Sequence, residues 1–340
     1  MPKPTAIVTG VPGWLGSRLV EKLLLSGREV RVAKFKNARY DAKAQPNLKI
    51  FDCDVTDPNS LLPLFHDTLG ATVFHCAGII HPTKGRQQFY DVNVEGTRHL
   101  LDAASVAGIR RFIHVSSNSP IGCNEDNDPK NLFDENSPYN PYMHYGQSKK
   151  EAEDLVNAAG KSGSFDIVII RPPWFYGPGQ PERQNLFFTM IKKGKAPIVG
   201  SGNNLRSMAY VDNICQALEL CESVDQAKGQ TYWIADERPY SMNEIVDTIE
   251  KVLERDFKMQ VAHKRMKLPD MASDIAYMAD SMLQSAGLYH QKVHVLSEMN
   301  KNIACKIDKA KKELGYNPEV SLEEGMRRSI EWVLANGGKI

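Results

Sequence analysis

The sequence predicts an α/β fold in which helices cover both faces of a doubly wound parallel sheet, followed by a smaller C-terminal cap. Short β-branched runs alternate with segments of helical periodicity through the first half, and a glycine-rich turn joins the first run to the first helix. Prolines and glycines then cluster just after Arg171, where the alternation ends. We therefore expect a sheet domain over residues 1–172 and a cap over most of residues 173–340, from which a segment of about 206–240 returns to the sheet.

Six strands are expected in the first half, each a short apolar run bounded by turn residues. They cover Ala6–Thr9, Glu29–Ala33, Leu48–Phe51, Thr72–His75, Arg111–Ser116 and Asp166–Ile170. The helices expected between them cover Leu15–Ser26, Ser60–Leu69, Tyr90–Ala107 and His144–Ala159. Strands that are joined through helices run parallel, because a parallel pair needs a long crossover connection.

The second half is expected to be mainly helical. A strand is expected at Gln230–Ala235, and the helices cover Arg183–Lys193, Asp212–Glu222, Met242–Glu254, Met271–Ala286, Asp308–Leu314 and Leu322–Asn336. Four methionines of this half are expected to fill its core rather than to bind a ligand: Met208, Met271, Met278 and Met282.

Composition excludes several classes of function. The 340 residues carry 42 Lys and Arg against 41 Asp and Glu, so no net field draws the chain to nucleic acid or to anionic lipid. The six cysteines show no CxxC pair and no zinc-like His spacing, which predicts free thiols and no metal site. No signal-peptide h-region and no membrane-spanning apolar run is found. We expect a cytoplasmic protein that does not insert into a membrane.

The first expected strand runs directly into three glycines spaced three apart. Glycine allows a tight turn, lets the backbone approach a pyrophosphate and lets the next helix pack close to the strand, while the helix N-terminus offers free N–H groups. Because the triplet lies between a strand and a helix, it predicts a dinucleotide site formed by Gly10, Gly13, Trp14, Leu15 and Gly16.

The end of the second expected strand bears on which dinucleotide fits. An acidic residue there would accept a hydrogen bond from the ribose 2′-OH and would repel a 2′-phosphate. This position is Lys34, followed by Lys36 and Arg39. Basic residues at a strand end are alternatively just solvated. We predict NADP or NAD as the cofactor, with a preference for NADP.

Further residues at strand ends are expected to line the same cofactor. Asp54 follows the third strand, where its carboxylate can accept from an adenine amino group or can cap the next helix. The fourth strand opens into small residues that would let a cofactor lie against the backbone, namely Cys76, Ala77 and Gly78.

A candidate acid–base pair lies on the helix expected after the fifth strand. Tyr145 and Lys149 share one helix face, so the ammonium favours ionisation of the phenol. Moving a phenol pKa from ~10 toward 7 takes about 4 kcal/mol, which a nicotinamide cation and a buried site would supply. Ser116 and Ser117 end the fifth strand, where a hydroxyl can donate to a substrate oxygen; alternatively, they are turn-forming serines.

Taken in order, these motifs resemble those of the extended short-chain dehydrogenase/reductases, the family of NAD-dependent epimerase/dehydratases and 3β-hydroxysteroid dehydrogenase-like enzymes. The resemblance covers nearly the whole chain. It rests on Gly10-x-x-Gly13-x-x-Gly16, Asp54-Val55, His75-Cys76-Ala77-Gly78, Asn93-Val94-Glu95-Gly96-Thr97, Ser116-Ser117, Tyr145-x-x-x-Lys149 and Arg171-Pro172-Pro173-x-x-Tyr176-Gly177-Pro178-Gly179. It implies a dinucleotide-binding Rossmann domain over residues 1–172 and an NAD(P)-dependent oxidoreductase or isomerase.

The resemblance also implies roles for individual residues. Tyr145 would be the general acid/base, Lys149 would bind the nicotinamide ribose and lower the pKa of the tyrosine, and Ser117 would hydrogen-bond the substrate oxygen. The cofactor contacts that it implies beyond the glycine turn include Val55, Asn93, Ser116, Tyr145, Lys149 and Pro172.

Two segments resemble enzymes with different substrates. Sugar-nucleotide epimerases and dehydratases usually carry an Asn where this chain has Trp174, which resembles the ketone-reductase and sterol-dehydrogenase side of the family. Residues 200–213, however, resemble the segment in which sugar-nucleotide enzymes present an arginine to a diphosphate, and Arg206 occupies that place. The alternative for Arg206 is a surface ion pair with Asp212. Arg183 and Trp174 are expected to line the same substrate site or, alternatively, to fill the core of the cap.

The leading hypothesis is an enzyme that acts on a secondary alcohol or ketone of a nucleotide sugar, as a 4-epimerase or a ketoreductase. The alternatives are a 3β-hydroxysteroid dehydrogenase-like reductase of a hydrophobic ketone, and a dinucleotide-sensing regulator without turnover, which the intact acid–base residues disfavour. A homodimer is expected, because the helices at Tyr90–Ala107 and His144–Ala159 resemble those that pair in the family's dimers. No role is assigned to His81, His114 and His144.

Overall fold

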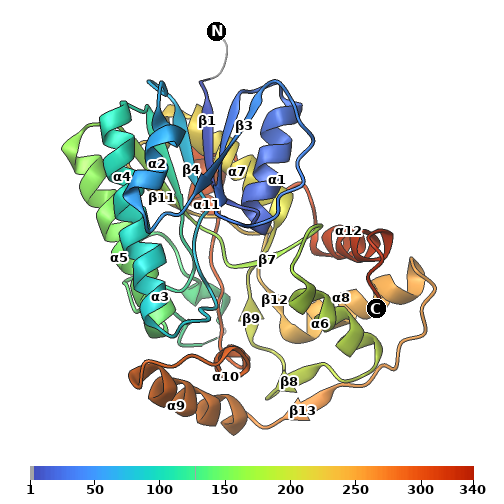
Figure 1. Cartoon of the computed structure of the whole chain (residues 1–340). Coiled ribbons are helices and arrows are strands. Elements are labelled where there is room, and N and C mark those ends of the chain that lie inside the picture. Colours follow the sequence, from blue (N-terminus) through green and yellow to red (C-terminus); the bar gives the residue numbers. More distant parts are fainter. Residues whose placement is uncertain (1–3, 127) are drawn as a thin grey trace.

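The computed structural model describes residues 4–126 and 128–340, and a seven-stranded parallel sheet lies at its centre (Figure 1). The strands are β1 (Ala6–Val11), β2 (Val30–Phe35), β3 (Leu48–Cys53), β4 (Thr72–His75), β5 (Arg111–Val115), β6 (Asp166–Arg171) and β11 (Gln230–Trp233). Their order across the sheet is β3-β2-β1-β4-β5-β6-β11. The direction of strand progression therefore reverses between β1 and β4, and ligands of open α/β sheets bind beside such a reversal, at the carboxyl ends of the strands.

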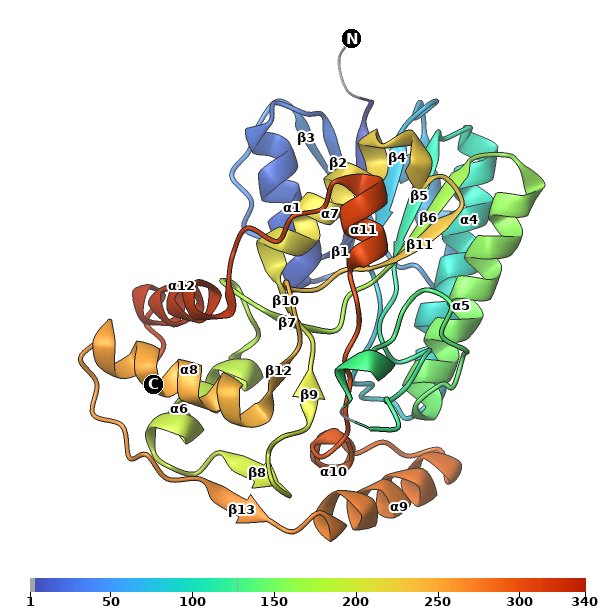
Figure 2. The ribbon, with the colours of Figure 1, turned by 180° about the vertical axis from the view of Figure 1, so that it is seen from behind.

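Two layers of helices cover the two faces of this sheet. One layer contains α1 (Trp14–Leu25), α7 (Val211–Ser223) and α11 (Asp308–Leu314), and the other contains α2 (Pro58–Phe65), α4 (Gly96–Ala107) and α5 (Met143–Ser162) (Figures 1 and 2). Val8 of β1 belongs to the first core, whereas its neighbour Ile7 belongs to the second. Because both faces are covered, the strands read as nearly continuous apolar runs. The predicted doubly wound α/β fold is confirmed.

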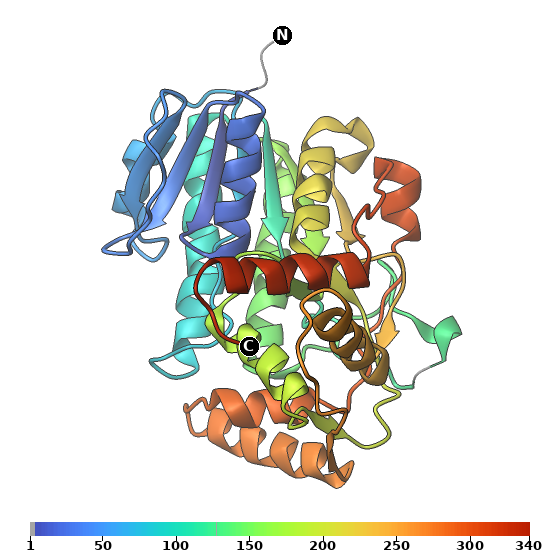
Figure 3. The same ribbon diagram turned by 90° about the vertical axis from the view of Figure 1, so that its right-hand side faces the viewer.

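Most of the second half forms a helical cap with a core of its own (Figure 3). Its helices are α6 (Glu182–Lys192), α8 (Met242–Arg255), α9 (Met271–Ser285), α10 (Gln291–Glu298) and α12 (Leu322–Ala335). Its short strands pair as β7 (Trp174–Tyr176) with β10 (Met208–Tyr210), β8 (Pro197–Val199) with β13 (Met266–Leu268), and β9 (Leu205–Arg206) with β12 (Tyr240–Ser241).

Three elements of the second half belong to the sheet. β11 pairs in parallel with β6, α7 packs against α1, and α11 packs against β11. The first two lie within the segment of about 206–240 that was expected to return, whereas α11 lies outside it. The division of the chain near residue 172 stays a prediction.

Several predicted helices differ in their bounds. α2 begins at Pro58, because the Asp57 side chain caps it by accepting from Asn59 N–H at 3.1 Å, and it ends at Phe65 rather than Leu69. The helix expected over Tyr90–Ala107 is preceded by α3 (Gln87–Phe89) and has its first turns wound as a π-helix, η1 (Tyr90–Glu95). Short 3₁₀ turns lie at η2 (Pro129–Asn131) and η3 (Asp225–Ala227). α10 and the cap strands are too short to show a period and were not predicted.

The expectation that four methionines fill the core is confirmed only for Met208, which is fully buried. It is wrong for Met271, Met278 and Met282 of α9, which are 65%, 58% and 75% exposed. The inward face of α9 is instead polar. Within the described residues, no helix is long and apolar enough to cross a membrane.

Candidate active site

The turn after β1 is a bare backbone cradle at the start of α1. A Cβ on Gly10, whose φ is +84°, would lie 2.6 Å from the carbonyl carbon of Cys76. A Cβ on Gly13 or Gly16 would lie 2.5 or 2.7 Å from the Gly10 carbonyl oxygen. Only glycine therefore allows the turn to lie against the end of β4, and the first turn of α1 carries no acidic residue that would repel a phosphate. This cradle fits a dinucleotide pyrophosphate.

The two residues that begin α1 contribute differently. Trp14 donates its indole N–H to the Pro178 carbonyl at 2.7 Å and packs against Phe175, so it ties the glycine turn to the segment after β7. The Leu15 side chain is buried in the core between α1 and the sheet, which leaves its backbone as the part that can face a cofactor.

The ends of β2 and β3 lie side by side, with Lys34 in register with Asp52. The Lys34 ammonium forms an ion pair with the Asp52 carboxylate and donates to the Ala38 carbonyl at 3.1 Å. Lys36 is exposed. Asp54 accepts from the Thr56 N–H at 2.9 Å and from its hydroxyl at 2.7 Å, so it closes a local turn and does not cap α2.

Asn93 fastens the chain after β4 to α5. It is buried in η1, where its side-chain oxygen accepts from Ile79 N–H at 2.8 Å and its amide donates to the Ser148 hydroxyl at 3.0 Å. A Cβ on Gly78 would lie 3.3 Å from the Asn93 oxygen and 4.0 Å from the Lys149 ammonium. The segment Cys76, Ala77, Gly78 therefore forms a floor between the glycine turn and Lys149.

Val55 and Pro172 follow β3 and β6, which lie on opposite sides of β1 and β4 in the sheet. The Val55 side chain packs so closely on α4 that a Cβ on Gly96 would approach it to 2.6 Å, and the Val55 carbonyl contacts the His99 ring at 2.9 Å. Pro172 directly follows β6 and is buried.

Tyr145 and Ser117 meet at the carboxyl end of β5. Burial raises the pKa of the Tyr145 phenol to about 12, against a lowering by its hydrogen bond with the Ser117 hydroxyl and with a smaller rise from Glu298. The Phe89 ring packs 5.8 Å from the Tyr145 ring. The phenol is therefore neutral at pH 7.

Lys149 lies one turn further along α5 and is 3% exposed. Its ammonium donates to the Val115 carbonyl at 2.9 Å and lies 3.3 Å from Nε2 of His114. Burial lowers the pKa of Lys149 to about 8, although Glu153 opposes the shift. The Lys149 ammonium thus bonds to the β5 backbone, and its expected lowering of the pKa of Tyr145 stays a prediction.

A buried ionic cluster holds α5 against the sheet. Arg171, the last residue of β6, pairs with Glu153 of α5 at 2.6 Å, and both side chains are almost fully buried. The Glu153 carboxylate also accepts from the hydroxyls of Ser116 at 2.5 Å and Tyr139 at 2.7 Å. The Ser116 hydroxyl therefore binds Glu153, whereas the Ser117 hydroxyl is the one beside the Tyr145 phenol.

Two buried imidazoles lie beneath the site. His75 contacts the hydroxyls of Thr9 and Thr97, each at 2.9 Å, and its ring lies 5.1 Å from that of His114. Burial lowers the pKa of His114 well below its usual value, and Lys149 adds to the shift, so the ring stays neutral. His114 was assigned no role from the sequence; a histidine inside an apolar strand, two residues before the serines, was the available signal.

The cap contributes Arg206, the last residue of β9. The guanidinium of Arg206 is buried and donates to the Glu298 carbonyl, while its Nε has no partner within the described residues. Burial raises the pKa of the Cys123 thiol to about 12, with Glu298 adding to the rise and Arg206 opposing it. The alternative of an Arg206 pair with Asp212 is wrong, because Asp212 pairs with Arg18 at 2.6 Å.

Arg183, at the start of α6, faces a pair that the sequence did not suggest. The His81 ring contacts the Tyr289 hydroxyl at 2.5 Å, and burial lowers the pKa of His81 to about 3, with Arg183 adding to the shift. Tyr289 also packs against Phe89, the neighbour of Tyr145. Trp174 packs on Phe187 of α6, at the edge of the cap core.

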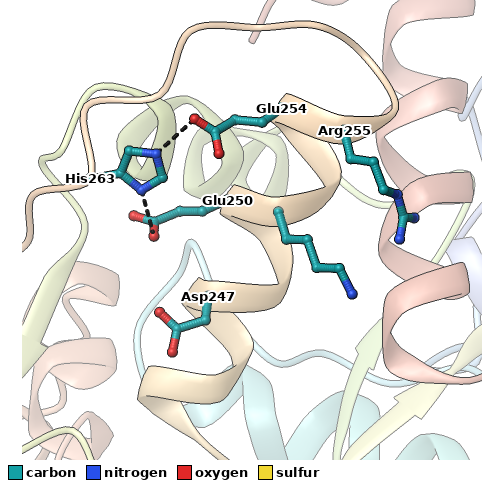
Figure 4. Close-up of a pocket in the computed structure, with 6 residues that line it drawn as sticks. Asp247, Glu250, Glu254, Arg255 and His263 are labelled. Carbon is teal, nitrogen blue, oxygen red and sulfur yellow. Dashed lines mark hydrogen bonds and ion pairs between the residues drawn. The ribbon is translucent and has the colours of Figure 1, made fainter.

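A pocket on the outer side of α8 is separate from these residues (Figure 4). Its His263 pairs with Glu254 at 2.7 Å and with Glu250 at 3.4 Å, and its Arg255 pairs with Asp256. Among residues 4–126 and 128–340, no group of three His, Cys, Asp or Glu is placed to hold a metal ion. We assign this pocket no chemistry.

Comparison with known proteins shows the family to which the chain is similar. Residues 6–235 match the model of the NAD dependent epimerase/dehydratase family. An uncharacterized protein of Sinorhizobium fredii is 45% identical over 98% of this chain and 96% of its own length. A 2-alkyl-3-oxoalkanoate reductase of Shewanella oneidensis is 26% identical over 95% of this chain and 84% of its own length. A dTDP-glucose 4,6-dehydratase from Streptomyces venezuelae, crystallised with NAD, is 25% identical, covers 98% of this chain and 97% of its own, and superposes with a TM-score of 0.76.

Proposed function

Because the chain belongs to the NAD-dependent epimerase/dehydratase family and is an enzyme of the extended short-chain dehydrogenase/reductase type, we propose that it interconverts a secondary alcohol and a ketone at Tyr145. One observation carries the proposal: a phenol beside the Ser117 hydroxyl lies one helical turn from a buried ammonium, at the carboxyl end of β5. A sensor without turnover has no use for such an acid–base pair.

The residues described above fit a nicotinamide dinucleotide. The glycine turn and the N-terminus of α1 would hold its pyrophosphate, the Cys76–Gly78 floor would lie under its nicotinamide end, and Lys149 would bind the adjoining ribose. When bound, the nicotinamide supplies or accepts the hydride.

Side chains of the protein transfer the proton that accompanies the hydride. In the reducing direction the neutral Tyr145 phenol donates its proton to the ketone oxygen, and the Ser117 hydroxyl donates a second hydrogen bond to the same oxygen. In the oxidising direction Tyr145 must ionise, and nearby positive charge, including that of Lys149, favours the phenolate.

We propose NADP as the preferred cofactor on the basis of Lys34 and Lys36, since the position that would select NAD carries no acidic residue. The ion pair between Lys34 and Asp52 weighs against this preference, because it partly neutralises the cation that a 2′-phosphate would meet. The family is described as NAD dependent. Equilibrium binding of NADH and NADPH, compared side by side, decides the matter.

We propose a nucleotide sugar as the substrate. Arg206 donates to the carbonyl of Glu298, and the carboxylate of Glu298 raises the pKa of Tyr145, which links the arginine to the acid–base residue. The buried Nε of Arg206 has no partner within the described residues and would donate to a diphosphate. Arg206→Ala should then weaken nucleotide-sugar binding by about 2–3 kcal/mol, the scale of a lost hydrogen bond to a charged group. NADP(H) affinity should stay unchanged, since Arg206 belongs to the cap. Calorimetric titration of UDP and dTDP sugars into both proteins makes the test.

A second candidate substrate is a hydrophobic ketone. It is supported by the aromatic pair Trp174 and Phe187 at the edge of the cap core, and by the similarity to a 2-alkyl-3-oxoalkanoate reductase. A neutral ketone has no phosphate for Arg206 to bind. If no nucleotide sugar binds the wild type and a hydrophobic ketone drives NADPH or NADH oxidation, this candidate replaces the nucleotide sugar.

We also propose a homodimer formed through the outer faces of α4 and α5, which pack side by side at one flank of the sheet. Val106 of α4 is 92% exposed. Val106→Lys should then shift the molecular mass measured by light scattering toward that of one chain.

A further inference from the structure

Helix α9 has its polar face buried and its apolar face exposed. Its buried residues include Ser273, Asp280 and Gln284, whose partners are supplied by neighbouring elements. Asp280 bonds to His294 of α10 at 2.7 Å, and Ser273 donates to the Leu296 carbonyl at 2.8 Å. A surface helix of a globular protein normally turns its apolar face to the core.

The exposed face of α9 carries a continuous apolar stripe. Met271, Ile275, Met278 and Met282 are 65%, 54%, 58% and 75% exposed. Their spacing of four, three and four residues places them on one side of the helix, over a length of about 17 Å. Single exposed hydrophobic residues are ordinary, but an aligned set of this kind marks a contact surface.

Four exposed lysines flank one end of this stripe. Lys264 and Lys267 lie on and just before β13, and Lys193 and Lys195 lie just before β8, which pairs with β13. Within the described residues none of the four forms an ion pair, whereas Asp274, a nearby acid, is paired with Lys301 at 3.1 Å. The Asp270 carboxylate lies so close to the Gly200 backbone that a Cβ there would meet it.

The elements that carry or adjoin the stripe and the lysines lie along one edge of the molecule. Figures 1 and 2 both show β8, β13, α9 and α10 along the lower edge, opposite the N-terminus. Lys267 is four residues before Met271, so their Cα atoms are at most about 14 Å apart. We call this surface, made of the four stripe residues and the four lysines, the α9 edge.

We propose that the α9 edge docks on the surface of a lipid bilayer that contains anionic lipids. An apolar stripe beside cations fits the boundary between acyl chains and anionic headgroups. In a second copy docked through a two-fold axis, the same eight residues would face one another, and because none of them is acidic the lysines would gain no counter-ion from this surface. The near-zero net charge of the chain does not oppose the proposal, because the attraction is local to this edge.

Docking at this edge would place the active site close to the bilayer. Tyr289, in the turn between α9 and α10, contacts His81 and packs on Phe89, which in turn packs on Tyr145. The proposal does not depend on which substrate is correct, because it rests on the outer surface of the hairpin and not on its inner contacts.

The test is co-sedimentation of the full chain with vesicles. We expect binding to vesicles of phosphatidylcholine mixed with phosphatidylglycerol, and little binding to phosphatidylcholine alone. Lys264→Gln with Lys267→Gln should weaken binding about 25-fold, at roughly fivefold per lysine. Met278→Gln with Met282→Gln, which keeps helix propensity, should weaken it at least about tenfold.

Matched variants on the sheet half test whether the loss of any exposed apolar residue or lysine weakens vesicle binding. Leu25→Gln with Leu62→Gln removes two residues that are 88% and 64% exposed, and Lys43→Gln with Lys312→Gln removes two exposed lysines. Both pairs should bind vesicles as the wild type does, and circular dichroism should show all variants folded.

Three outcomes would overturn the proposal. The wild type could bind neither vesicle type, or the methionine variant could bind as tightly as the wild type. In the third outcome, sedimentation without lipid shows a dimer that the methionine variant dissociates, in which case a second copy of the chain covers the stripe.

Discussion

We expect Glu153→Gln to lower the free energy of unfolding by about 3–5 kcal/mol, the cost of leaving a buried arginine without its counter-ion. Glu153 and Arg171 have side chains that are 0% and 4% exposed, and their charged atoms lie 2.6 Å apart. The amide keeps the shape of the side chain but removes the charge. Arg171 cannot shed its proton, so its charge stays uncompensated between α5 and β6.

Denaturant unfolding followed by tryptophan fluorescence measures the loss. Glu151→Gln is the matched control, because that carboxylate lies on the same helix, is only partly buried and bonds to Gln147 at 2.8 Å; its change should stay within about 0.5 kcal/mol. The double variant Glu153→Leu with Arg171→Leu removes both charges and should recover most of the loss. A loss below about 1 kcal/mol for Glu153→Gln would refute the inference that this pair anchors α5.

Burial lowers the pKa of Lys149 from 10.5 to about 8, so the unfolded chain binds more protons between these values and stability should rise with pH across that window. Lys149→Met should flatten the rise in unfolding curves taken at several pH values, weaken cofactor binding and shift the activity profile to higher pH; an unchanged stability profile would count against the buried ammonium. Lys34→Asp should move the binding preference from NADPH toward NADH, because a carboxylate there repels a 2′-phosphate and accepts from the ribose hydroxyl. Tighter binding of NADH than of NADPH by the wild type would show that Lys34 does not select the cofactor.

The sheet could be predicted because local signals agree with long-range packing there. β1, β4, β5 and β6 are covered on both faces, so each reads as a short apolar run, and the glycine turn lies where strand meets helix. The same agreement placed Tyr145 and Lys149 on one helix.

The cap could not be predicted so well, because its contacts depend on partners far away in the chain. The exposed face of α9 carries the apolar pattern of a core face, and only the position of His294 reveals why Asp280 is buried. Likewise the alternative pair of Arg206 with Asp212 does not form, because Arg18, distant in sequence, pairs with Asp212. Tyr289 lies in a connecting turn with no motif around it.

The central claim is that Tyr145 exchanges a proton with the substrate oxygen, and Tyr145→Phe tests it most directly. Steady-state turnover of NADPH or NADH is measured with the substrate identified from the sugar and ketone panels, and cofactor affinity is measured separately by fluorescence titration. The variant should keep cofactor affinity within a few-fold and lose about 10²–10⁴ in kcat, because only the transferable proton is removed. Retention of more than about a tenth of the wild-type kcat would contradict the claim.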